Sequence, residues 1–205
     1  MTARRTYHHG DLRAALITAA LTLIAEKGIA ALSVAEAARR TGVSTAAPYR
    51  HFPSRQALLA AAAIAAAEEL GTEMRSALEA VDRAEPDWAV AALGATAGVY
   101  VRFVSRRRAG FDLIFNPELQ GFGDAELLTA GRVVIDLLLP LGNALTGGDM
   151  PAALQLLERH LAAAHGYATL FLSGFFTRRT TEVEDIAAEA VAASRALAEA
   201  ALGSR

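Results

Sequence analysis

Residues 33–52 read Ser33-Val-Ala-Glu-Ala-Ala-Arg-Arg-Thr-Gly42-Val-Ser44-Thr-Ala-Ala-Pro-Tyr49-Arg-His51-Phe52. Ser33 and Glu36 have the spacing of a capping box, which predicts that a helix begins at Ser33. Gly42 supplies a tight turn. Ser44 is a suitable cap for a second short helix, which Pro53 ends after Phe52. The stretch therefore predicts two short helices joined by a turn, an arrangement that fits the major groove of DNA.

Charge is distributed unevenly along the chain. The 205 residues carry 20 Arg and Lys against 22 Asp and Glu, for a net charge of −2. Residues 1–56 hold eight of the basic residues but only three acidic ones, a local excess of +5. This excess surrounds the predicted helix-turn-helix, so it favours a polyanionic partner that binds there.

The composition excludes several classes of function. The chain has no cysteine, which removes disulfides, thiolate nucleophiles and sulfur-ligated metal sites. The longest uncharged apolar run, residues 57–67, is too short to span a bilayer, which needs about 20 residues. No metal-binding His-Glu-x-x-His, phosphate-binding glycine loop or nucleophile elbow is present. We therefore expect a cytoplasmic, non-enzymatic protein with no cofactor and no metal.

Helical periodicity runs through the whole chain, and no segment alternates with a period of two. This predicts an all-α fold with two domains: a three-helix head over residues 1–55, which contains the predicted DNA-binding segment, and a second helical domain over residues 56–205. The expected helices cover residues 11–27, 33–41, 44–52, 54 to about 78, 87–107, 109–115, 123–145, 151–177 and 182–202.

A helix that reads DNA must be slim, anchored from behind and flanked by groups that grip phosphates. Ala46 and Ala47 keep the leading face slim, while Val43 and Phe52 are expected to anchor the segment. The predicted DNA-binding residues are Arg5, Ser44, Thr45, Ala46, Ala47, Tyr49, Arg50, His51 and Arg55. Pro48 departs from the usual pattern, since it lacks an amide hydrogen and shifts or strains the helix start.

Residues 41–59, Thr-Gly42-Val-Ser-Thr-Ala-Ala-Pro-Tyr49-Arg-His51-Phe52-Pro-Ser-Arg55-Gln-Ala-Leu58-Leu, resemble the signature of the TetR family of bacterial transcription regulators. The resemblance spans roughly residues 8–60. It implies that Tyr49, His51 and Arg55 clamp phosphates and that Thr45 approaches bases. It also implies that the remaining helices sense a ligand and form a dimer.

Residues 87–177 hold most of the aromatic side chains. Aromatic residues at helical spacing usually form a core, but an apolar pocket with a few polar groups is also the usual small-molecule site. The candidate ligand-binding residues are Trp88, Tyr100, Phe103, Phe111, Phe115, His165, Tyr167 and Phe171. A filled core and an open pocket for a small hydrophobic effector both remain possible at this point.

The long Ala- and Leu-rich helices near residues 151–177 and 182–202 can pack against the same pair in a second copy, or only within one chain. Two recognition helices held at groove spacing bind DNA far more tightly than one. The sequence thus predicts a homodimeric, ligand-responsive repressor that leaves its operator when an effector binds. The alternatives are an ordinary buried helical hairpin at residues 33–52 and a helical small-molecule carrier that binds no DNA.

Overall fold

The computed structural model describes residues 9–44, 46–108, 111–114, 116–119 and 125–203. Within these ranges every regular element is helical, so the predicted all-α fold is confirmed. The α-helices are α1 (His9–Lys27), α2 (Val34–Thr41), α3 (Arg55–Glu79), α4 (Trp88–Arg107), α5 (Phe111–Ile114), α6 (Ala125–Thr146), α7 (Met150–Leu172) and α8 (Val183–Gly203). Short 3-10 turns are η1 (Ile29–Ala31), η2 (Pro48–Arg50) and η3 (Pro117–Leu119).

The amino-terminal head begins as the sequence predicts. Gly28 follows α1 with a φ of 80°, a conformation that glycine adopts at little steric cost. The Ser33 side chain accepts a hydrogen bond from the Glu36 amide, so it caps α2. Gly42 ends α2 in the left-handed conformation with a φ of 72°.

The segment after Gly42 differs from the prediction. We expected about two turns of α-helix between Ser44 and Phe52, but the described residues form only the 3-10 turn η2. Pro48 cannot donate the amide bond that would continue a helix from Ser44, and the Ala47 amide bonds to the Ser44 carbonyl instead. The prediction of an α-helix here was therefore wrong in type, although the turn occupies the predicted place.

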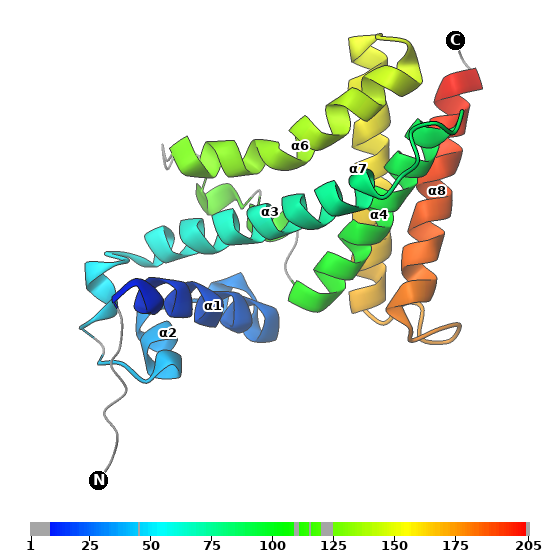
Figure 1. Ribbon diagram of the computed structural model, residues 1–205. Helices are drawn as coiled ribbons and strands as arrows, with labels where there is room; N and C mark the ends of the chain where they lie inside the picture. Colours follow the sequence, from blue (N-terminus) through cyan, green and yellow to red (C-terminus); the bar gives the residue numbers. More distant parts are fainter. Residues whose placement is uncertain (1–8, 45, 109–110, 115, 120–124, 204–205) are drawn as a thin grey trace.

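The long helix α3 connects the head to the rest of the chain. In Figure 1 α3 lies between α1 and α6, and α4 packs against it, while α7 and α8 pack against α4 with nearly parallel axes. The prediction for residues 151–177 was too long, because α7 ends at Leu172. Gly174, with a φ of 78°, turns the chain there.

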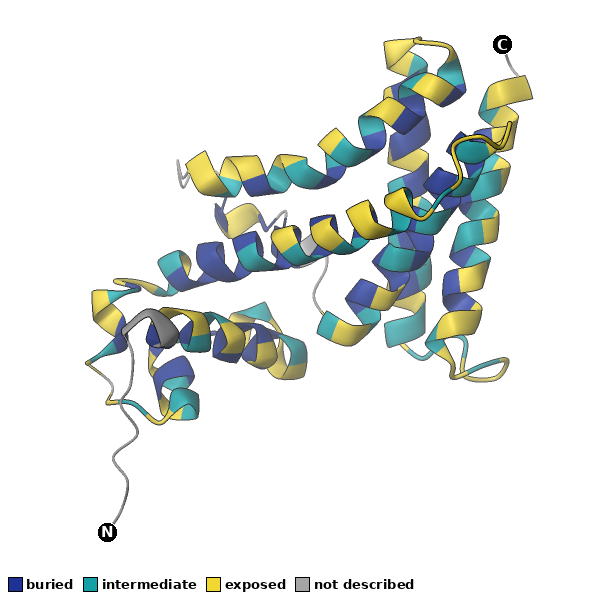
Figure 2. Cartoon of the chain, viewed as in Figure 1, coloured by how far each residue is buried: buried dark blue, intermediate teal, exposed yellow. Residues whose placement is uncertain are grey.

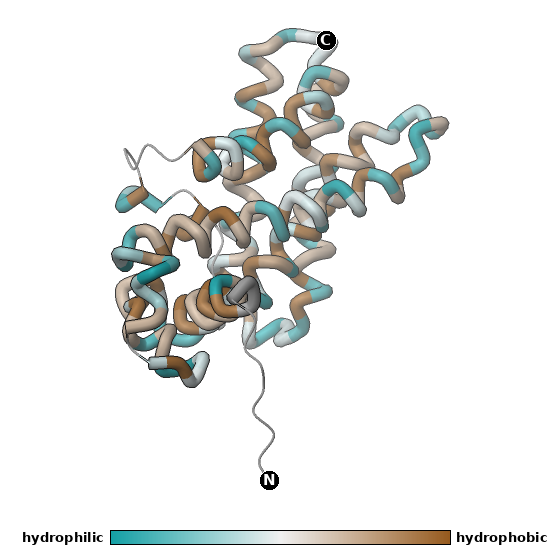
Figure 3. Tube along the Cα trace, turned by 60° about the vertical axis from the view of Figure 1, so that its left-hand side comes forward, coloured by the Kyte–Doolittle hydropathy of each residue, from teal (hydrophilic) through white to brown (hydrophobic). Residues whose placement is uncertain are grey.

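The core runs continuously from the head into the helical bundle. Buried residues form one side of most helices, and exposed residues form the other (Figure 2). Hydrophobic and hydrophilic residues accordingly alternate in short runs along each helix (Figure 3). Within the described part, α4 alone is apolar and long enough to cross a membrane by length and composition, but 67% of its apolar window is buried, as in a core helix.

Candidate nucleic-acid interface

The turn η2 presents its side chains to solvent. Tyr49 is 50% exposed, and Ser44, Ala46 and Arg50 are also exposed. Ala47 and His51 are partly buried. Most of the predicted reading residues are therefore accessible to a nucleic acid, whereas Arg5 and Thr45 lie outside the described residues.

Two buried residues anchor this exposed turn. Pro48 is buried, and Phe52 is only 2% exposed because it joins the core of the head. The Arg13 guanidinium lies over the Phe52 ring, 5.6 Å from its centroid. Val43 is partly buried and packs against the same core. The turn is thus held from behind while its outer face stays open.

Three of the six described Arg and Lys residues of the head have acidic partners, and two of these lie next to each other in α2. Arg39 pairs with Glu36, and Arg40 pairs with Glu26 and Glu36. The hydrogen bonds from Arg39 lower the pKa of the partly buried Glu36 carboxyl to about 2. Arg50 differs from these residues, because it has no ion pair within the part of the chain that the structure describes. Its charge is therefore available to a phosphate.

Arg55 was predicted to contact phosphate, and the structure gives its guanidinium three internal partners. Nε donates a hydrogen bond to the Leu32 carbonyl at 3.0 Å, and Nη2 donates to the Ile29 carbonyl at 2.9 Å. Nη1 donates to the carboxylate of Glu118 in η3. A phosphate contact by Arg55 stays a prediction, and it would compete with this carboxylate.

Two of the predicted ligand-binding residues meet between α4 and α7. The Tyr100 hydroxyl lies 3.0 Å from His165 Nδ1, and the two rings contact each other edge to face. Tyr100 is 3% exposed, while His165 is partly buried. The pair places two polar groups in an otherwise apolar region, as a binding site for a mostly apolar molecule requires.

The other predicted ligand-binding residues are not brought to this pair. Trp88 and Phe103 lie near opposite ends of α4, about 22 Å apart along the helix axis. Phe103 is fully buried in the core, and Trp88 lies beneath the Arg83 guanidinium. Tyr167 stacks on Phe176. The predicted set of eight residues therefore does not form one pocket.

Three of the eight predicted ligand-binding residues remain, namely Phe111, Phe115 and Phe171. Phe171 lines a cavity of about 180 Å³ near the end of α7, together with Arg108, Phe176 and Thr181 among others. Phe115 and the side chain of Phe111 lie outside the described residues.

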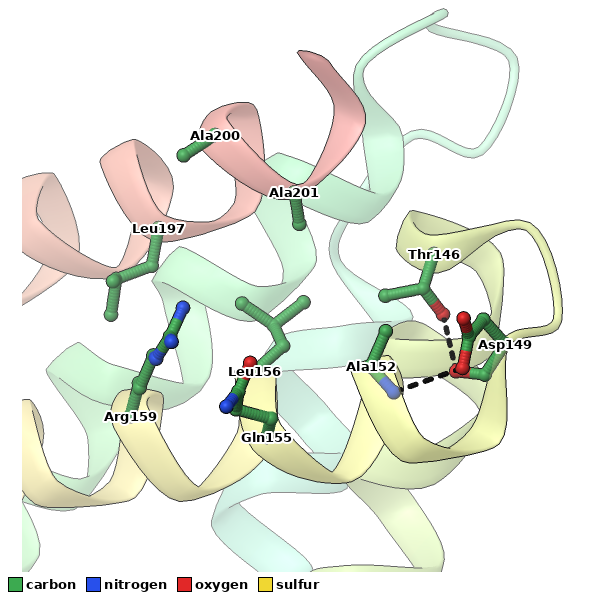
Figure 4. A pocket seen from close by; sticks show the side chains of 9 residues that line it. All are labelled: Thr146, Asp149, Ala152, Gln155, Leu156, Arg159, Leu197, Ala200 and Ala201. Atoms are coloured by element: carbon green, nitrogen blue, oxygen red, sulfur yellow. Dashed lines mark hydrogen bonds between the residues drawn. The ribbon is translucent and has the colours of Figure 1, made fainter. Parts of the chain in front are cut away.

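A groove separates the first half of α7 from the last turns of α8. Its volume is about 380 Å³. In Figure 4, Arg159 of α7 extends toward Leu197 of α8, and Gln155 lies one turn earlier on α7. In the single chain, an open groove therefore runs between the exposed edges of α7 and α8.

A buried polar cluster was not predicted from the sequence. His160 of α7 is fully buried, with Nδ1 2.9 Å from the Ser194 hydroxyl and Nε2 3.4 Å from the Thr96 hydroxyl. Burial lowers the pKa of His160 to about 4, so the ring is neutral at physiological pH. Three helices thus meet around one neutral imidazole. The sequence signal for its burial is a set of apolar residues one turn away on the same helix face, Leu156, Leu157 and Ala164.

An exposed, anchored turn in a basic head, carried by a long helix on a helical bundle, defines a helix-turn-helix regulator of transcription. Two family models match the chain. The model for bacterial regulatory proteins of the tetR family covers residues 16–62, and the model for the tetracyclin repressor-like C-terminal domain covers residues 93–194. The chain belongs to the TetR family. No curated protein sequence matches it significantly.

Solved structures share the fold over nearly the whole chain. A protein of unknown function from Rhodococcus sp. RHA1 is 29% identical, with a TM-score of 0.76 over 96% of this chain and 98% of that one. A tetR-family transcriptional regulator from Streptomyces coelicolor is 22% identical, with a TM-score of 0.68 over 97% and 85% of the two chains. The fatty acid degradation regulator FadR from Bacillus halodurans is 13% identical, with a TM-score of 0.67 over 92% and 96%.

Proposed function

We propose that this TetR-family regulator is a repressor that binds operator DNA as a homodimer and is released by a small hydrophobic effector. The observation that carries the proposal is the open turn η2, where the exposed Tyr49 is followed by Arg50, which has no ion pair with any described residue. DNA binding and ligand responsiveness are typical of the family. The division into residues 1–55 and 56–205 belongs to the same proposal, as does a cytoplasmic location.

The effector is proposed to bind near the Tyr100–His165 pair, among α4 and α7. These two polar groups adjoin apolar core residues, which suits a mostly hydrophobic molecule with one hydrogen-bonding group. The effector must bind the released conformation more tightly than the DNA-bound one. A hundredfold loss of DNA affinity requires about 2.7 kcal/mol of such differential binding.

The homodimer is proposed to form through α7 and α8. Ala152, Gln155 and Arg159 face the groove beside α8, and the same stripe continues about one and three turns later with Ala163 and Leu170. Leu170 is 41% exposed in the single chain, so a second copy would remove it from water. A four-helix arrangement of two such pairs would hold both heads on one side.

Selection of bound fragments from genomic DNA tests the proposal most directly. A regulator enriches a small set of sites with an inverted repeat, because a two-fold dimer binds two half-sites. A helical carrier that never binds DNA enriches no sequence, and this outcome would remove the proposal. The same fragments then provide an operator for the experiments with variants.

Substitution Arg50→Gln tests whether the turn η2 contacts DNA phosphate. Each phosphate contact contributes about 0.9 to the slope of log K against log salt concentration, so the variant should bind operator DNA with a slope shallower by roughly this amount for each chain of the proposed dimer. Arg75→Gln is a matched control, because Arg75 is also exposed but lies about 30 Å further along, in α3. Equal slopes for the two variants would remove Arg50 from the interface.

A further inference from the structure

The Arg55 guanidinium lies where the head, α3 and the turn η3 meet. Two of its donors are held by the carbonyls of Ile29 and Leu32, both in the connection between α1 and α2. These contacts fix the plane of the guanidinium relative to the head. A third donor points away from that connection and bonds to the Glu118 carboxylate.

Glu118 is held in place by its own backbone. Its amide donates a hydrogen bond to Asn116 Oδ1 at 2.8 Å, and its carbonyl accepts one from Gln56 Nε2, also at 2.8 Å. The next residue, Leu119, is 6% exposed and anchors the turn in the core. Glu118 therefore presents its carboxylate to Arg55 through a turn that α3 and the core both secure.

The ion pair nevertheless remains accessible. The Glu118 side chain is 52% exposed and the Arg55 side chain 34% exposed. Exposed pairs of this kind are weak, because water and salt screen both charges. A phosphodiester is also an anion, and its two non-bridging oxygens can accept hydrogen bonds from a guanidinium as the oxygens of a carboxylate do. Glu118 thus takes the one Arg55 nitrogen that does not bond to the Ile29 and Leu32 carbonyls.

We propose that Glu118 competes with DNA phosphate for Arg55 and thereby sets how tightly the head binds duplex DNA. Glu118 is a positioning residue, since it touches Arg55 and acts only through it. The inference rests on the proposed DNA binding but not on the effector or the operator. It places part of the control of DNA affinity in η3, outside the head itself.

Substitution Glu118→Gln tests the competition in the full-length protein. The change removes the charge but keeps the backbone bonds to Asn116 and Gln56, so the turn should stay folded. Binding to a mixed-sequence 40-base-pair duplex is measured over a range of salt concentrations. The variant should bind roughly five- to tenfold more tightly at low salt, with a slope steeper by about 0.9 for each chain of the proposed dimer, because each chain neutralises one more phosphate.

Two controls separate this role from general electrostatics. Glu79→Gln also removes one exposed carboxylate, at the far end of α3, and should change neither affinity nor slope appreciably. In an Arg55→Gln background, Glu118→Gln should have no further effect. Circular dichroism and thermal melting of each protein establish that it is folded. If Arg55→Gln does not fold, the difference between Glu118→Gln and Glu79→Gln decides the question.

The outcomes are distinct. A steeper slope for Glu118→Gln alone, absent in the Arg55→Gln background, supports the proposal. A slope equal to that of the wild-type protein, or a gain that persists without Arg55, overturns it while leaving DNA binding intact. A wild-type protein that fails to bind any duplex overturns both this inference and the proposed function.

Discussion

At the scale of single residues, His160 shows how burial controls a titratable group. The Thr96 hydroxyl donates to the Leu93 carbonyl at 2.8 Å, so it can only accept from His160 Nε2. Nδ1 then accepts from Ser194, and one neutral tautomer satisfies both ring nitrogens. His160 therefore links α4, α7 and α8 as a neutral ring, and its protonation in the folded protein is energetically unfavourable.

This arrangement predicts a loss of stability in acid. The pKa of His160 is about 4 in the folded protein and near 6.5 in the unfolded chain. As the pH falls from 6.5 to 4, the unfolded chain therefore binds a proton that the folded protein does not. His160 should remove about 3 kcal/mol of unfolding free energy over this range and none above pH 7.

Urea denaturation at several pH values measures the effect. His160→Gln keeps a polar partner for Ser194 but does not titrate, so its unfolding free energy should fall less between pH 6.5 and 4. The carboxylates titrate alike in both proteins and cancel in the comparison. Parallel pH profiles for the two proteins would show that His160 is not protonated on unfolding.

At the scale of the elements, two glycines of α4 allow α8 to approach closely. A Cβ atom at Gly94 would lie 2.9 Å from Arg195 Cγ and 3.3 Å from Val191 Cγ1. At Gly98 it would lie 3.0 Å from Val191 Cγ2. The four-residue spacing puts both glycines on one face of α4, so the two helix backbones pack together there.

Gly94→Ala should therefore destabilise the protein by up to about 2 kcal/mol. Helix propensity alone favours alanine by about 1 kcal/mol, but forcing a methyl group into a packed contact costs about 1–3 kcal/mol. Gly131→Ala in α6 is the matched control, since nothing lies within 4 Å of its added Cβ. It should leave stability unchanged or raise it. Chemical denaturation of both variants checks the opposite signs.

Ion pairs join α3 to α4 at another place. Arg106 bonds to Glu69 and Glu73, and Arg107 bonds to Glu69 through two nitrogens. Partial burial works to raise the pKa of Glu69, but these guanidinium contacts outweigh it and hold the pKa below its usual value. The helix that carries the head is thus tied to the bundle by charge as well as by packing.

At the scale of the whole molecule, the proposed dimer predicts that a charge placed on one face of α7 separates the two chains. Light scattering should give the mass of two chains at micromolar concentration. Leu170→Glu should shift the protein toward the monomer, because it buries a charge in the proposed interface. Leu154 is similarly exposed, at 45% against 41%, but lies about 160° around α7 from Leu170.

Leu154→Glu is therefore the matched control, and it should leave the dimer intact. A monomeric wild-type protein would remove the proposed interface. Equal dissociation by both substitutions would instead move the interface to another face of α7.

The sequence by itself determined the class of this protein. Local sequence patterns were sufficient for this, because each depends on residues only a few positions apart. They are the helix caps at Ser33 and Ser54, the turn at Gly42 and the helical period. The uneven charge pointed to the head as the nucleic-acid interface, and the family matches agree.

Only the tertiary structure decided what the individual polar residues contact. Arg55 meets Glu118 across 63 positions, and Tyr100 meets His165 across 65, so no local pattern contains either pair. Local patterns also do not contain the burial of His160 or the ion pair of Arg107. The separation of the predicted aromatic residues has the same origin. Each depends on which helix faces which, and packing of the complete chain determines that.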